Sequence, residues 1–151
     1  MLTIDILFED ISPDKVLEDL TNKALLESST YVKLTHNPEV SVVFTNDAFI
    51  QELNKQYRHQ DKPTNVLSFP LPGDPFKNEA LGDIIISIKT IQKEAEQQGK
   101  TFEDHLQHML VHGFLHLLGY DHEEAHEAEA MENLEVEILK DLGISNPYKE
   151  V

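Results

Sequence analysis

The chain has 151 residues, no cysteine and a formal net charge of −16. This length predicts one domain over residues 1–151, with room for a real core. The absence of cysteine excludes disulfides and thiolate ligands, so any metal would be held by nitrogen and oxygen. The first residues lack a signal-peptide pattern, and no apolar run approaches the roughly 20 residues that span a membrane. We therefore expect a cytoplasmic protein without membrane contact.

The negative charge is unevenly distributed along the chain. Between Glu123 and Asp141 there are eight acidic residues and a single lysine, a net charge of −7. Phosphate binding normally needs a basic surface, so this charge argues against a broad nucleic-acid-binding face. The only arginine of the sequence is Arg58.

Hydrophobic periodicity predicts about four strands and five helices. The expected strands are residues 2–8, 39–45, 66–69 and 81–88. The first expected helix has Ser12 as its cap and Pro13 in its first helical position, and the second has Asn46 or Asp47 as its cap. The other three are expected over residues 87–98, over residues 101–118 and over the acidic segment up to Gly143. This order fits an α+β fold with a small mixed sheet. The helix at 101–118 is apolar around most of its circumference, so it should be central and buried.

Three histidines form the strongest candidate site. His112 and His116 are four residues apart, so on a helix both imidazoles leave the same face one turn apart. Gly119 can end that helix in a left-handed turn, after which the chain can bring His122 to the same point. Three converging imidazoles form a zinc site with an open fourth position, which is typical of catalytic zinc. The spacing predicts one zinc ion per chain, bound by His112, His116 and His122.

The same histidine spacing occurs in the metzincin proteases, but one residue differs. Gly113 stands where those enzymes have the glutamate that serves as general base for attack on a peptide bond. The predicted site can therefore hold a metal but lacks the base of a protease.

A second polar stretch, residues 53–70, contains groups that can bind phosphate. Arg58 offers a planar fork that fits a phosphate through two hydrogen bonds. Lys55 and Lys62 could add positive charge. A solvated surface loop with an arginine at a helix end is an equally open interpretation.

Three further residues have more than one possible role. Asp83, inside an apolar strand, is either a buried partner of a site histidine or an exposed polar residue. Asp121 is either a partner of the site or a turn residue. His126 follows His122 by four residues, and is either an alternative ligand or a surface residue at the start of the acidic helix.

The run His112-Gly113-x-Leu115-His116-Leu117-x-Gly119-Tyr120-Asp121-His122 resembles the signature of the YbeY family. The polar stretch 53–70 and the segment Leu81-Gly82-Asp83-Ile84 also resemble that family, so the resemblance covers roughly residues 53–143. The family commonly has aspartate where this chain has Asn65. A neutral amide could still serve the turn at that position.

Members of that family are bacterial single-strand-specific endoribonucleases that mature ribosomal RNA. The resemblance implies that His112, His116 and His122 hold zinc and that Arg58 is a catalytic residue of the cleft. It also implies action at the 3′ end of the small-subunit ribosomal RNA and a link to ribosome quality control. The implied partners are single-stranded RNA, ribosomal RNA and the ribosome or its proteins, whereas DNA is not expected.

The predicted site is consistent with this chemistry. A metal held by three histidines lowers the pKa of bound water toward about 7, and Arg58 could stabilise negative charge on phosphate oxygens. No side chain stands out as general base. Two alternatives stay open: a ribosome assembly factor with a structural zinc, whose acidic surface meets basic ribosomal proteins, and a less favoured metallopeptidase.

Overall fold

The computed structural model describes residues 2–34, 36–121 and 124–148. Within these residues it has four strands and five helices, as the periodicity predicts, and the α+β fold class is confirmed. The elements in chain order are β1 (Thr3–Phe8), α1 (Lys15–Ser29), β2 (Glu39–Thr45), α2 (Asp47–Arg58), β3 (Val66–Pro70), β4 (Ala80–Ser87), α3 (Ile88–Gln98), α4 (Phe102–Leu117) and α5 (Ala125–Asp141).

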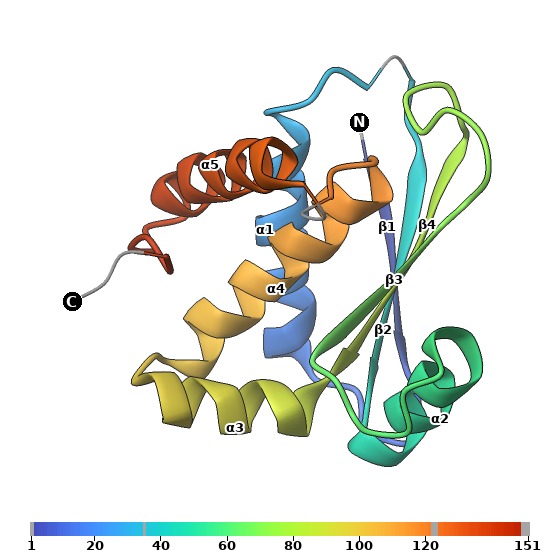
Figure 1. Cartoon of the computed structure of the whole chain (residues 1–151), viewed down its shortest axis with the longest axis vertical. Coiled ribbons are helices and arrows are strands. Elements are labelled where there is room, and N and C mark those ends of the chain that lie inside the picture. Colours follow the sequence, from blue (N-terminus) through green and yellow to red (C-terminus); the bar gives the residue numbers. More distant parts are fainter. Residues whose placement is uncertain (1, 35, 122–123, 149–151) are drawn as a thin grey trace.

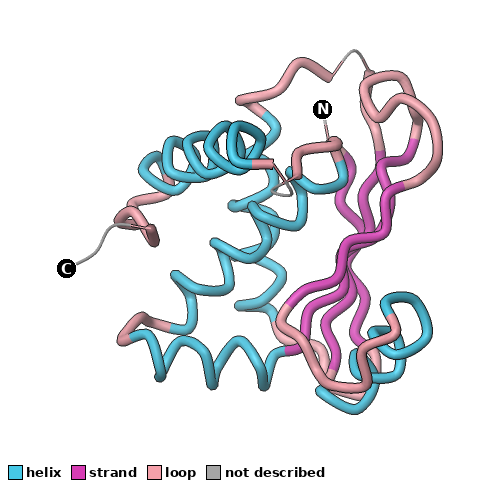
Figure 2. The backbone as a smooth tube through the Cα atoms, in the orientation of Figure 1, coloured by secondary structure: helices cyan, strands magenta, loops and turns pink. Residues whose placement is uncertain are grey.

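The four strands form one mixed sheet in the order β1-β2-β4-β3. The first three strands of that order run parallel to one another, and β3 pairs with β4 in the antiparallel direction. Figure 1 shows α1, α3, α4 and α5 on one side of the sheet, with α2 at its lower end. The tube in Figure 2 shows the same layering and the long loop that joins β3 to β4.

The side chains of neighbouring strand residues point to opposite faces, and this alternation divides the core into two clusters. Val42 of β2 and Ile84 and Ile86 of β4 belong to the main cluster, which α1, α4 and α5 complete. Ile85 of β4 points the other way and packs with Ile50 of α2 in a smaller cluster. Residues next to one another in β4 therefore serve different sides of the molecule.

Helix α4 is the central buried helix that its composition predicts, because 11 of its 16 residues are buried. The hydroxyl of Thr101 caps its start by accepting from the backbone N–H of Asp104 at 3.1 Å. At its other end the N–H of Tyr120 donates to the carbonyl of Leu115 at 3.1 Å. This closing turn requires a positive φ at Gly119, which has φ +96°, and so confirms the left-handed turn. The helix thus ends directly after the turn that carries His116.

The expected cap of the first helix is wrong by two residues. Asp14, not Ser12, is the N-cap of α1, and its carboxylate accepts from the N–H of Val16 at 2.9 Å. An aspartate is as good a cap as a serine, so Pro13 comes to lie just before the helix rather than in its first turn. None of the helices in the described part of the chain is long and apolar enough to cross a membrane.

Candidate active site

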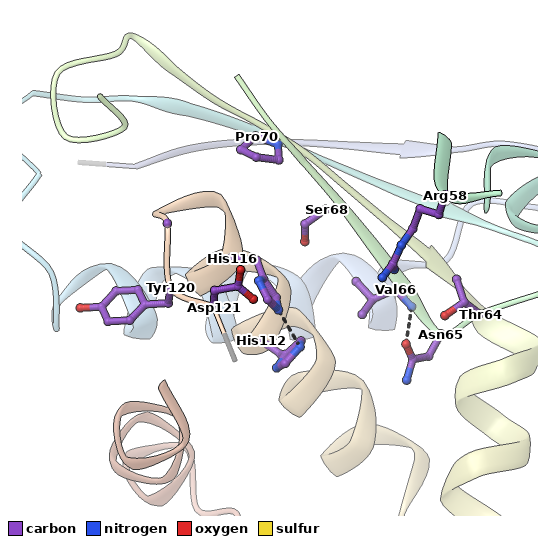
Figure 3. A pocket seen from close by; sticks show the side chains of 11 residues that line it. Arg58, Thr64, Asn65, Val66, Ser68, Pro70, His112, His116, Tyr120 and Asp121 are labelled. Atoms are coloured by element: carbon purple, nitrogen blue, oxygen red, sulfur yellow. Dashed lines mark hydrogen bonds between the residues drawn. The ribbon is translucent and has the colours of Figure 1, made fainter. Parts of the chain in front are cut away.

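A cleft of about 540 Å³ lies between the end of α4 and the edge strand β3. It brings together the two polar stretches that the sequence singles out, although they are more than 40 residues apart. Figure 3 shows its lining side chains. The residues that line the cleft are Arg58, Thr64, Asn65, Val66, Ser68, Pro70, His112, His116, Gly119, Tyr120 and Asp121.

The imidazoles of His112 and His116 face each other at one wall of this cleft. Their Nε2 atoms are 3.0 Å apart, as the dashed line in Figure 3 marks. Two Zn–N bonds of about 2.0–2.1 Å at a tetrahedral angle would hold the nitrogens about 3.3 Å apart. The spacing of this pair therefore suits two ligands of one metal ion. His122, the expected third ligand, lies outside the described residues.

Behind His112 stands Glu135, an acidic residue of α5 with no exposed surface. Its Oε1 accepts from Nδ1 of His112 at 2.7 Å, and its Oε2 accepts from the hydroxyl of Tyr148 at 2.6 Å. Burial by itself would raise the pKa of Glu135, but the neighbouring His108, at 3.5 Å, and the hydrogen bonds from His112 and Tyr148 outweigh burial and lower this pKa to about 2. Glu135 is thus a buried carboxylate that contacts His112 and does not line the cleft.

Most acidic residues of α5 lie on an outer face of the molecule, but Glu135 does not. The other described acidic residues of α5 are exposed or half-buried. In the sequence, Glu135 is only one of the eight acidic residues between Glu123 and Asp141. A signal was present, since Glu135 stands four residues after Met131 and three before Ile138, within the apolar stripe that α5 buries.

Arg58 is the last residue of α2, and its exposed side chain lines the cleft. The helix ends there because His59 adopts a left-handed conformation with φ +59°. Figure 3 shows the Arg58 side chain pointing toward Val66 and Asn65. Neither Lys55 nor Lys62 lines the cleft, so among the described lining residues Arg58 is the only arginine or lysine.

Asn65 links the cleft to α3. Its side-chain oxygen accepts from the N–H of Val66 at 2.7 Å, and its Nδ2 donates to Oε1 of Glu94 at 3.0 Å. The same Glu94 oxygen lies 2.8 Å from Nε2 of the buried His105. The amide at position 65 therefore does what an aspartate could not, because it donates a hydrogen bond to a carboxylate.

Changing Asn65 to aspartate should destabilise this protein by about 1–3 kcal/mol at pH 7. The change replaces a donor with a second carboxylate beside Glu94, and like charges at this distance repel. Thermal unfolding measures the effect. Adding Glu94→Gln to the Asn65→Asp protein should recover most of the loss, since the new amide can donate to the introduced carboxylate. An Asn65→Asp protein as stable as the wild type would contradict this account.

Gly113 lets α4 approach the sheet closely. The hydroxyl of Ser68 donates to the carbonyl of Gly113 at 3.0 Å. A Cβ at Gly113 would lie 3.0 Å from Cγ2 of Ile84, 3.2 Å from Oγ of Ser68 and 3.3 Å from Cγ2 of Val66. The position where a metzincin has its glutamate therefore faces β3 and β4 in this fold.

Gly113→Glu should not create a peptidase, and it should lower stability. A side chain at this position meets the sheet, and overpacking of this kind costs about 1–3 kcal/mol. Casein hydrolysis and thermal unfolding are the measurements, and Gly113→Ala separates the steric effect from that of the charge. Clear hydrolysis of casein by Gly113→Glu would show that the difference from the proteases is smaller than the structure indicates.

The structure decides between several open roles. Asp83 is exposed and lines a different cavity, on the α2 side of the sheet, so it does not contact the histidines. Asp121 lines the cleft, and Figure 3 shows its side chain beside His116. His126 is exposed and lies 3.6 Å from Glu124. Among the described residues, Glu124, His126 and Glu127 lie close enough together to hold an ion. All three are exposed, and exposed acidic groups commonly occur without one.

The fold and the cleft define an α+β protein with a histidine pair at the end of a buried helix and an arginine at the opposite edge. A family model described as Endoribonuclease YbeY matches residues 5–143. Proteins named Endoribonuclease YbeY include one from Bartonella quintana, 49% identical over 100% of this chain and 99% of the relative. Another, from Methylocella silvestris, is 48% identical over 95% of this chain and 79% of the relative.

A solved structure agrees with these sequence matches. The solution structure of TM1509 from Thermotoga maritima superimposes with a TM-score of 0.62 and 30% identity, and the match covers 98% of this chain and 100% of that one. The chain belongs to the YbeY family. The resemblance to that family, predicted from the sequence, is thereby confirmed.

Proposed function

We propose that this protein is a metal-dependent endoribonuclease that cleaves single-stranded RNA and acts in maturation of the 3′ end of small-subunit ribosomal RNA and in ribosome quality control. The observation that carries the proposal is the histidine pair, with its Nε2 atoms 3.0 Å apart, in one cleft with Arg58. The name shared by the relatives supports the reaction class. The whole chain would act as one domain, in the cytoplasm, with the ribosome as its partner.

The proposed metal is one zinc ion per chain, with His112, His116 and His122 as ligands. The donor set fits, because Nδ1 of His112 is engaged by a carboxylate and its Nε2 faces His116. The His122 assignment rests on the spacing after Gly119. When bound, zinc supplies Lewis-acid chemistry at neutral pH, which lowers the pKa of water and neutralises phosphate charge.

Arg58 is the proposed catalytic residue of this chain. Its guanidinium can bind two phosphate oxygens at once and keeps its positive charge while the phosphate becomes more negative during cleavage. It comes from α2 and the histidines come from α4, so a phosphodiester in the cleft would lie between them.

Cleavage of a short single-stranded RNA by zinc-loaded and chelated protein tests the proposal. Loss of cleavage on chelation with retained fold, and recovery on adding zinc, supports an enzyme. Unfolding on chelation would instead support a structural zinc in a ribosome assembly factor. A double-stranded RNA of the same sequence serves as the control for strand preference.

Binding of RNA should depend only weakly on salt. Arg58 is the one arginine or lysine among the described lining residues, so even with Lys55 or Lys62 nearby only two or three phosphates can be neutralised. The slope of log K against log salt should be roughly −1.5 to −2, at about −0.7 per phosphate of a single strand. A salt series with the His116→Ala protein measures it. A slope near −5 would require a basic track and would contradict the cleft-only picture.

A further inference from the structure

Glu135, on α5, links His112 to the segment that bears Tyr148. Neither α5 nor that segment lines the cleft. The carboxylate can only accept hydrogen bonds, so both of its close partners must donate to it. His112 therefore carries its hydrogen on Nδ1, 2.7 Å from Oε1 of Glu135. In the neutral ring this leaves Nε2 as the nitrogen with the lone pair, and Nε2 is the atom that faces His116.

Tyr148 holds the other oxygen of the same carboxylate. It comes from the segment after α5, beyond residue 143, where the family match ends. Its hydroxyl donates to Oε2 of Glu135 at 2.6 Å, so its oxygen is left to accept from Nε2 of His108, which lies 3.2 Å away. The Tyr148 and His108 rings also meet edge to face, with centroids 5.5 Å apart. The carboxylate is thus fixed in orientation from two sides.

The His108 side chain is the natural comparison for His112. It lies one turn earlier on α4, and its Nε2 is 3.5 Å from the same Oε1 of Glu135, too far for a strong hydrogen bond. It is buried and does not line the cleft. Glu135 therefore makes its short contact with the cleft-lining histidine and not with its neighbour.

We propose that Glu135 and Tyr148 are positioning residues for the metal-facing nitrogen of His112. Glu135 fixes the tautomer and the ring orientation of His112, and Tyr148 fixes the orientation of Glu135. The inference rests on the proposed metal site and extends it to a residue outside the family match. Loss of such a partner of a metal-binding histidine typically lowers metal affinity by about 10–100-fold.

The test combines zinc affinity with the ring state of His112. Zinc affinity is measured on folded protein by competition with a chromophoric chelator, for wild type, Glu135→Met, Glu135→Gln and Tyr148→Phe. We expect a loss of about 10–100-fold for Glu135→Met. Glu135→Gln keeps an acceptor for Nδ1–H and should lose less, as should Tyr148→Phe. Glu137→Gln removes the same charge from an exposed position of α5 and should leave zinc affinity unchanged.

Nitrogen-15 NMR of the metal-free protein supplies the second readout. Wild type should show His112 with hydrogen on Nδ1, and Glu135→Met should shift the ring toward a mixture of the two tautomers. Unchanged affinity and an unchanged tautomer in Glu135→Met would overturn the inference. If the Glu135→Met protein does not fold, the Tyr148→Phe protein provides the test. Wild-type zinc affinity and an unaltered His112 signal in the Tyr148→Phe protein would overturn the role of Tyr148. Failure of the wild type to bind zinc would contradict the proposed function, whereas the tautomer measurement needs no metal.

Discussion

Replacing His116 with alanine is expected to remove the proposed zinc ion and abolish RNA cleavage while the protein stays folded. His116 is only half-buried at the last turn of α4, so its loss leaves little unfilled space in the core. Two remaining ligands would hold zinc poorly, and without the metal the cleft would lose the Lewis-acid chemistry and part of the charge stabilisation that zinc would supply. We expect a rate at least about 10³-fold lower. Zinc content after dialysis, the cleavage rate and thermal unfolding are the three measurements.

The alternative ligand is tested in the same series. His122→Ala should behave like His116→Ala, because His122 is the proposed third ligand. His126→Ala should keep its zinc, since His126 is exposed and does not line the cleft. If zinc were lost only in His126→Ala, the proposed ligand set would be wrong.

Arg58→Lys is expected to lower cleavage by about 10²-fold although the positive charge is kept. Lysine offers a point charge on a flexible stem, whereas the guanidinium binds two phosphate oxygens in a fixed geometry. Arg58 is exposed and ends α2, so zinc content and thermal stability should stay at the wild-type level. Single-turnover cleavage of a short single-stranded RNA is the measurement.

Lys55 provides a matched control, because it is exposed on the same helix but does not line the cleft. Lys55→Gln should change the cleavage rate by less than Arg58→Lys does, even though it removes a charge. Full activity of the Arg58→Lys protein would exclude Arg58 from the chemistry and leave the histidine pair as the only proposed catalytic feature.

Those parts of the fold that depend on local chemistry could be predicted from the sequence. Asn46 caps α2 and Thr101 caps α4, each by a hydrogen bond to a backbone N–H three residues later. Gly119 ends its helix with a positive φ value, as predicted. The i, i+4 spacing of His112 and His116 likewise depends only on the helical repeat, so their shared face followed directly.

The family resemblance extended this local information to the cleft. The resemblance implied that Arg58 acts in the same cleft as the histidines. From the residue types alone, Arg58 was equally well explained as a phosphate-binding residue or as a surface residue. The structure brings Arg58 and the histidines to one cleft through the antiparallel pairing of β3 with β4. That pairing joins segments distant in the sequence, and no local pattern specifies it.

The sequence by itself determined the helices, the strands and the histidine pair, because these depend on residues a few positions apart. Only the tertiary structure decided which side of the sheet Asp83 faces, that Asn65 donates to Glu94, and that Glu135 is buried against His112. A carboxylate on an acidic helix is normally solvated, since burial of an unpaired charge is strongly unfavourable. Glu135 is buried because two donors from other elements meet it, and that arrangement exists only after α4, α5 and the segment bearing Tyr148 have packed together.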